Sequence, residues 1–232
     1  MARPKHQRRS SPTTSVSTGG AATWPTYRVG NSDYIHALGV IASVYNLLEF
    51  RFRSLFAIYT RLPSEPAYKL FGKLSNEMRL ELIRGAIPFS PHPEPIKQDV
   101  NHFFTGYKIC ADNRNILMHS TVAYVFGPGD IPCPELSPPG HQPQGVVFQK
   151  FSKGDPFKIN TYRVSLPEIR AFAEAIHDLE VYGNELYWHI LKTHEPNRYR
   201  ALGFPKNARF PLPSRPALPN GLRMSEMENG ED

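Results

Sequence analysis

The sequence predicts a mainly α-helical protein, an up-and-down helical bundle with a small antiparallel β insert before its last helix. Three observations support this prediction. Apolar residues recur at steps of three and four through several long segments. A capping-box pattern marks the start of the last segment. Between the third and the last segments, β-prone runs alternate with turn residues. Helices in this order, separated by short connections, are typical of a bundle.

Length and composition are those of one globular domain with tails. The chain has 232 residues, of which 40% are hydrophobic and 21% charged, so it is long enough to form a packed core. Residues 1–30 are rich in Ser, Thr, Gly, Pro and basic groups, and residues 196–232 are rich in Pro. We expect a disordered basic tail, a domain over residues 31–195, and a disordered Pro-rich tail. An organelle transit peptide is the alternative interpretation of the first tail.

Three helices are predicted before the insert. The first has an apolar stripe that begins at Leu38, with Ser32 or Asp33 as its cap and with Pro63 and Pro66 after its end. Its stripe consists of Leu38, Ile41, Tyr45, Leu48, Phe52, Leu55, Tyr59 and Leu62. The second should cover Tyr68 to Ile87, with Leu70, Leu74, Met78 and Leu82 on its apolar face. The third should run from Ile96 to about Ser120, with an apolar side formed by Val100, Phe103, Phe104, Tyr107, Cys110 and Leu117.

The insert should occupy about residues 121–165. Three β-prone runs, Val122–Phe126, Val146–Phe151 and Lys158–Val164, predict its strands. Ser165 and Glu168 then form the capping box of the last helix. The apolar positions of this helix should pack against those of the first: Ile169, Phe172, Ile176, Leu179, Gly183, Leu186 and Ile190.

Several classes of protein are disfavoured. The two cysteines, Cys110 and Cys133, form no CxxC pair, which argues against a disulfide framework or a zinc ribbon and fits a reducing cytoplasm. No apolar run approaches the length of a membrane span. The nine histidines are dispersed and no HExxH or Asp-rich pattern occurs, so we expect neither a metal nor another cofactor. The net charge of +6 favours polyanionic partners.

The segment Arg114-Asn115-Ile116-Leu117-Met118-His119 is the candidate for chemistry. On a helix, Asn115 and His119 share a face, and Arg114 lies about 140° around from His119. Arginine offers a fork of donors that matches phosphate oxygens, and histidine transfers protons near neutral pH. In RNA, removal of the 2′-hydroxyl proton lets that oxygen attack the adjacent phosphate, and this route requires no metal. The alternative is a surface Arg and a His that complements the helix dipole.

This segment resembles the Arg-x4-6-His motif of the HEPN superfamily, including the Asn that often follows the Arg. A long first helix with Tyr45-Asn-Leu-Leu-Glu49, a motif near the end of a later helix and a closing helix also resemble the family. The resemblance covers roughly Asp33 to Thr193. The β insert departs from it, as does Thr121, which stands where toxin-type members often have a Tyr.

The resemblance implies a metal-independent endoribonuclease, a defence or stress effector that works in the cytoplasm as a homodimer. Two motifs would face each other across a two-fold axis, and a regulatory protein would restrain the enzyme. His119 would act as acid and base, Arg114 would hold the phosphate, Asn115 would orient neighbours and Glu49 would set the position of His119 or Arg114.

Two other hypotheses use the same fold. A non-catalytic module that binds RNA or protein needs a basic surface but tolerates the loss of His119. A purely structural helical dimer predicts that the chain's own residues cover the polar strip, meaning the face of the helix around Asn115 that Arg114 and His119 flank. Tyr187, Trp188 and His189 on the last helix are interpreted as packing residues in preference to a base-stacking platform.

Overall fold

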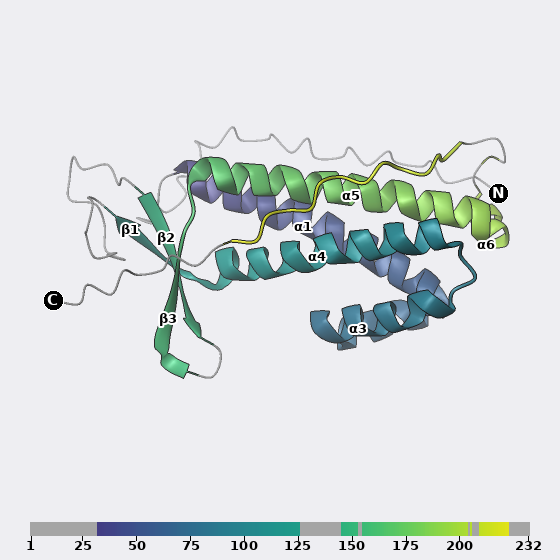
Figure 1. Cartoon of the computed structure of the whole chain (residues 1–232), viewed down its shortest axis with the longest axis horizontal. Coiled ribbons are helices and arrows are strands. Elements are labelled where there is room, and N and C mark those ends of the chain that lie inside the picture. Colours follow the sequence, from purple (N-terminus) through teal and green to yellow (C-terminus); the bar gives the residue numbers. More distant parts are fainter. Residues whose placement is uncertain (1–31, 126–144, 153–154, 204, 206–208, 223–232) are drawn as a thin grey trace, which may run out of the picture.

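Three long helices form the body of the protein in the computed structural model, which describes residues 32–125, 145–152, 155–203, 205 and 209–222. They are α1 (Ser32–Tyr59), α4 (Glu94–His119) and α5 (Leu166–His194), and they lie along one another in Figure 1. Ion pairs join Asp33 to Arg170 and Arg51 to Glu180, so α1 and α5 run in the same direction. The end of α1 lies near the start of α4, so α4 runs back beside them in the opposite direction. The prediction of a mainly helical protein is confirmed.

The core lies between these helices, at the positions that the periodicity predicts. The stripe of α1 from Ile41 to Tyr59, the predicted apolar positions of α4 and those of α5 are buried. α1 packs along α5 more extensively than along any other described helix. Gly106 of α4 faces Leu179, and Gly183 of α5 faces Phe103. An added Cβ at either glycine would meet these side chains at 2.8 Å and 2.3 Å, so the two glycines permit the close approach of α4 and α5.

The second predicted helix is two helices, so this prediction was wrong in detail. α2 (Ser64–Lys73) and α3 (Asn76–Ala86) are separated by Leu74 in an extended conformation and by Ser75. The hydroxyl of Ser75 accepts a hydrogen bond from the backbone N–H of Met78, and this cap starts a new helix. The break also rotates the buried face, because Ala67, Phe71, Leu80 and Ile83 are buried whereas Met78 and Leu82 are exposed. A short 3-10 turn, η1 (Ile87–Phe89), follows.

A three-stranded antiparallel sheet lies at one end of the bundle, as the sequence predicts (Figure 1). Its strands are β1 (Thr121–Val125), β2 (Gly145–Ser152) and β3 (Asp155–Arg163), in the order β1-β2-β3. The central strand places Phe148 opposite Val122 on one side and Tyr162 on the other. Phe148 is fully buried, so the sheet belongs to the same core. Residues 126–144, with Cys133, lie outside the described residues.

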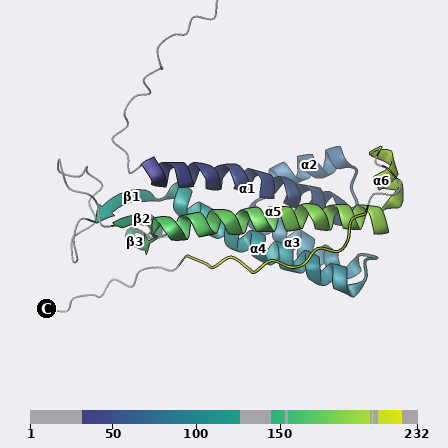
Figure 2. The ribbon, with the colours of Figure 1, turned by 90° about the horizontal axis from the view of Figure 1, so that it is seen from above.

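The Pro-rich C-terminal region is not a disordered tail over the part that the structure describes. Pro196 occupies the first turn of a short helix, α6 (Pro196–Ala201), where its missing N–H is not needed. Residues 209–222, here called the C-terminal segment, then run back along α5 and α4 towards the sheet (Figures 1 and 2).

Side chains of the bundle hold the C-terminal segment mainly by its main chain. His189 and His102 contact the carbonyl oxygens of Phe210 and Pro216 at 2.8 Å and 2.9 Å. Asn113 donates to the carbonyl oxygen of Asn220 and accepts from the N–H of Leu222. Such contacts need no apolar periodicity in the segment, which is why its composition alone suggested disorder. The first predicted tail, residues 1–30, lies outside the described residues. Among those described, no helix is both long and apolar enough to cross a membrane.

Candidate functional site

The Arg114–His119 motif occupies the last turns of α4, next to the sheet. The helix ends because Ser120 is extended, with φ −95° and ψ 151°, and Thr121 then pairs with Gln149 of β2. The Ser120 hydroxyl donates to the carbonyl oxygen of Ile116 and so binds one of the unpaired carbonyls of the helix end. The motif therefore sits where a helix meets a strand, at a fixed position in the fold.

Arg114 and His119 are in contact. Nη1 of Arg114 lies 3.3 Å from Nε2 of His119. A guanidinium N–H can only donate, so Nε2 accepts and the proton of the neutral ring is on Nδ1. The two Cα atoms are about 140° apart around the helix axis, and the length of the Arg114 side chain bridges this angle. His119 itself is exposed.

The positive charge of Arg114 has no acidic partner among the residues that the structure describes. Its Nε is buried and makes no hydrogen bond. Its guanidinium lies 5.5 Å from the ring centroid of Tyr45 on α1, within the range of a cation–π contact. A buried donor without an acceptor costs about 1–3 kcal/mol. The terminal N–H groups of Arg114 are the reachable part of this partly exposed side chain, and an anion bound there would offset the charge of the guanidinium.

Asn115 and Lys150 complete the polar strip. The amide oxygen of Asn115 accepts from Nη1 of Arg114 at 3.4 Å, and its backbone oxygen accepts from Nζ of Lys150 at 3.3 Å. Lys150 belongs to β2, and no sequence pattern singles it out, because only the fold brings β2 to the end of α4. Arg114 thus contacts the exposed histidine, and a second cation, Lys150, reaches the backbone of the same turn.

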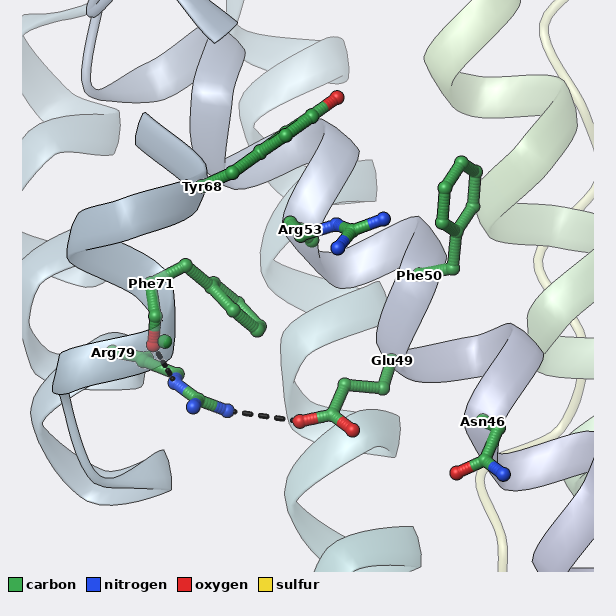
Figure 3. A pocket seen from close by; sticks show the side chains of 8 residues that line it. Asn46, Glu49, Phe50, Arg53, Tyr68, Phe71 and Arg79 are labelled. Atoms are coloured by element: carbon green, nitrogen blue, oxygen red, sulfur yellow. Dashed lines mark hydrogen bonds and ion pairs between the residues drawn. The ribbon is translucent and has the colours of Figure 1, made fainter. Parts of the chain in front are cut away.

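Glu49, which the resemblance placed in the site, does not contact Arg114 or His119. Its Oε1 accepts from Nη1 of Arg79 on α3 at 2.9 Å (Figure 3). The same nitrogen donates to Oδ1 of Asn76, which also accepts from the hydroxyl of Tyr107. Glu49 is therefore linked towards the motif only indirectly, through a chain of hydrogen bonds that begins at Arg79.

The last members of that chain are two buried tyrosines. The hydroxyl of Tyr45 donates to that of Tyr107 at 3.0 Å. Burial raises the pKa of both phenols above the usual value of 10, so both remain protonated hydrogen-bond donors at neutral pH. Tyr45 contacts Arg114 through its ring and Tyr107 through its hydroxyl, and so connects the motif to the Arg79–Glu49 pair.

The polar strip is not covered by the described part of the chain. His119 is exposed, and Arg114, Asn115 and Lys150 are partly exposed. This observation disagrees with the hypothesis of a purely structural dimer, which needs the chain's own residues over the strip. A hollow of about 260 Å³ between α3 and α4 reaches the motif at Asn115. In the described ranges, no group of three or more His, Cys, Asp or Glu side chains is placed to hold a metal ion.

Other residues noted in the sequence have structural partners. The ring of Trp188 stacks on Phe210 of the C-terminal segment at a centroid distance of 5.8 Å, which confirms its interpretation as a packing residue. Cys110 is fully buried, and burial raises the pKa of its thiol to about 12. His92 is buried against Tyr59, with 3.0 Å between its Nδ1 and the phenol oxygen.

Comparisons of the chain with models of known protein families, with curated proteins and with solved structures found no match.

Proposed function

We propose that the protein is a metal-independent endoribonuclease whose site is built around Arg114 and His119. The proposal is based mainly on the surroundings of the Arg114 side chain. Its charge is uncompensated by any described acidic side chain, its Nε is buried without a partner, and it touches an exposed histidine. A guanidinium fork matches the oxygens of a phosphate, and the basic balance of the chain favours a polyanion such as RNA.

The chemistry follows from the contact between the two side chains. A phosphate that binds Arg114 draws Nη1 away from Nε2 of His119 and so frees the lone pair of the ring. The ring then takes the proton of the 2′-hydroxyl, whose oxygen attacks phosphorus, and the bond to the 5′ oxygen breaks. The products are a 2′,3′-cyclic phosphate and a 5′-hydroxyl end. Lys150 adds positive charge beside the phosphate, and Asn115 keeps Arg114 oriented.

The leaving 5′ oxygen needs a proton, which the protonated imidazole of a second His119 supplies if two copies of the chain face each other. One copy presents its motif on an open surface, as half of a composite cleft would. α1 also carries exposed apolar residues on one face, Val40 and Leu47, seven positions apart. They offer apolar surface for the second copy.

Cleavage of total RNA by the purified protein in EDTA tests the proposal. We expect the wild type to cut, and the variants His119→Ala and Arg114→Ala to lose at least a hundredfold in rate. His177→Ala is the matched control, because His177 is an exposed histidine on α5 outside the motif. If no form cuts and all bind RNA equally, the proposal is wrong.

The alternative function is RNA binding without cleavage. Arg114 and Lys150 favour it as much as they favour catalysis, because both would hold phosphates. The two functions differ at His119, whose replacement by Ala leaves a binding module intact. RNA bound at equal affinity by wild type and His119→Ala, without cleavage by either, would identify the binding module.

A further inference from the structure

A second polar pocket lies between α1, α2 and α3, apart from the Arg114–His119 motif. It has a volume of about 380 Å³ and is lined by Asn46, Glu49, Phe50, Arg53, Tyr68, Phe71, Gly72 and Arg79. Figure 3 shows the charged groups of Arg53, Glu49 and Arg79 in this pocket, with aromatic rings on both sides. The volume is within the range of small-molecule sites.

Arg53 is the unusual member of this pocket. Its guanidinium lies between two rings, 4.6 Å from the centroid of Tyr68 and 5.0 Å from that of Phe50. Its Nε is buried without a hydrogen bond, and no acidic side chain in the described ranges pairs with it. The rings fix the plane of the guanidinium and leave its N–H edge for an anion.

Arg79 is held in place by several contacts. Its Nε donates to the carbonyl oxygen of Phe71 at 2.7 Å, its Nη1 donates to Glu49, and its guanidinium lies 3.9 Å from the ring centroid of Phe71. The hydrogen bond from Arg79 to Glu49 is accepted by Oε1 of the carboxylate. The other carboxylate oxygen, Oε2, accepts no hydrogen bond from the described residues, and the side chain of Glu49 is 38% exposed. Glu49 is therefore a rigid acceptor with capacity left.

The pocket thus combines one unpaired cation, one carboxylate with free acceptor capacity and an aromatic face. Phe50 is 44% exposed and offers a surface for stacking a planar ring. Among the RNA bases, guanine presents two adjacent N–H donors, N1–H and N2–H, to a carboxylate. Adenine, cytosine and uracil present no such pair of donors to it. A phosphate on the same nucleotide would accept from the outer N–H groups of Arg53, whose charge has no acidic partner among the described residues.

We propose that this pocket binds a guanine nucleotide, with the base edge on Glu49 and the phosphate on Arg53. The nucleotide comes either as free guanosine monophosphate or as one residue of a single-stranded RNA. The inference does not rest on the proposed cleavage, because none of the pocket residues belongs to the Arg114–His119 motif. Tyr45 and Tyr107 connect the two places. Tyr107 donates to Asn76 beside Arg79 and accepts from Tyr45, whose ring contacts Arg114.

Isothermal titration of the His119→Ala protein tests the proposal without interference from cleavage. The probes are guanosine, adenosine and uridine monophosphates and inorganic phosphate. We expect guanosine monophosphate to bind at least tenfold more tightly than the other three. Repeating the titration with short single-stranded RNAs, with and without one guanine, separates the two sources. A guanine dependence in the RNA but not among free nucleotides would identify RNA as the source.

Three variants locate the binding. Arg53→Met should lose most of the affinity, and Glu49→Gln should lose the preference for guanine, because an amide group has only one acceptor oxygen. Gln still accepts from Arg79, so the fold is kept. Lys69→Met is the matched control, since Lys69 is an exposed cation of α2 paired with Glu65 outside the pocket. Equal binding of all four probes together with equal binding of the RNAs with and without guanine would overturn the proposal. Binding that survives Arg53→Met, or no binding of guanosine monophosphate and guanine-containing RNA, would also overturn it.

Discussion

Replacing Gly183 by Ala tests how closely α4 and α5 pack. The new Cβ would lie 2.3 Å from Cε2 of Phe103 and 2.9 Å from its Cδ2, whereas carbon atoms prefer about 3.5–4.0 Å. Phe103 is fully buried and packs against Phe104 with 5.3 Å between ring centroids. The ring cannot move into solvent, so either it leaves its rotamer or the two helices separate.

Overpacking of this kind destabilises by about 1–3 kcal/mol. Alanine regains about 0.5–1 kcal/mol of helix propensity, so we expect a net loss of about 1–2 kcal/mol. For a domain of this size that corresponds to a Tm lower by roughly 2–8 °C. Thermal unfolding followed by circular dichroism measures it.

Gly39→Ala is the matched control, because Gly39 lies in the middle of α1 and an added Cβ meets no atom within 4 Å. This variant should be more stable than the wild type by about 0.5–1 kcal/mol. A loss of stability in Gly183→Ala together with a gain in Gly39→Ala would show that Gly183 is needed for the close packing of α4 and α5. A Gly183→Ala protein as stable as the wild type would refute the reasoning.

Three further predictions concern groups that fix the fold. Burial lowers the pKa of His92 from 6.5 to about 4, so the unfolded chain binds more protons between these values and stability falls as the pH drops from 6.5 towards 4, by at most about 3 kcal/mol. Urea unfolding as a function of pH should show this slope, and His92→Gln should flatten it; an unchanged slope would assign it to other groups. Ser165→Ala removes the capping box with Glu168 and should destabilise by about 1 kcal/mol, with unchanged stability as the contradicting result. Asn113→Ala removes two hydrogen bonds to the C-terminal segment, so the amide hydrogen of Leu222, which donates to Asn113, should exchange roughly tenfold faster, while exchange in α1 stays unchanged. Unaltered exchange in the segment would show that other contacts hold it.

Periodicity predicted the long helices because their burial is continuous along one face. The apolar positions of α1, α4 and α5 repeat at three and four and are buried in the structure. The Ser165–Glu168 capping box could be predicted from the sequence because both of its hydrogen bonds join residues three positions apart. The same reasoning failed at Ser75, where an apolar pattern from Leu70 to Leu82 continued across a helix break. A local cap outweighed that pattern.

Contacts between distant segments were beyond the reach of sequence patterns. The C-terminal segment has no apolar periodicity, and it is held partly through carbonyl groups that every residue has and partly through single side chains such as Phe210 and Arg215. Trp188 and His189 were correctly interpreted as packing residues, but their partner, Phe210, could not be identified. Only the fold shows that Pro-rich residues pass beside α5.

The sequence could predict only those residues of the candidate site that lie on a single helix, α4. Arg114, Asn115 and His119 are neighbours on α4, and the structure joins their side chains. Lys150 and Glu49 belong to other elements, so their places depend on tertiary packing. In the structure, Lys150 contacts the motif at the backbone of Asn115, whereas Glu49 forms an ion pair with Arg79.

The central claim is that the 2′-hydroxyl of RNA is the nucleophile and that His119 takes its proton. A short RNA and the same oligonucleotide with 2′-deoxy sugars, each incubated with the protein in EDTA, test this claim directly. We predict that the RNA is cut to products with 2′,3′-cyclic phosphate and 5′-hydroxyl ends, and that the 2′-deoxy strand stays intact. Equal cleavage of both strands, or RNA products that carry 5′-phosphates, would contradict the account.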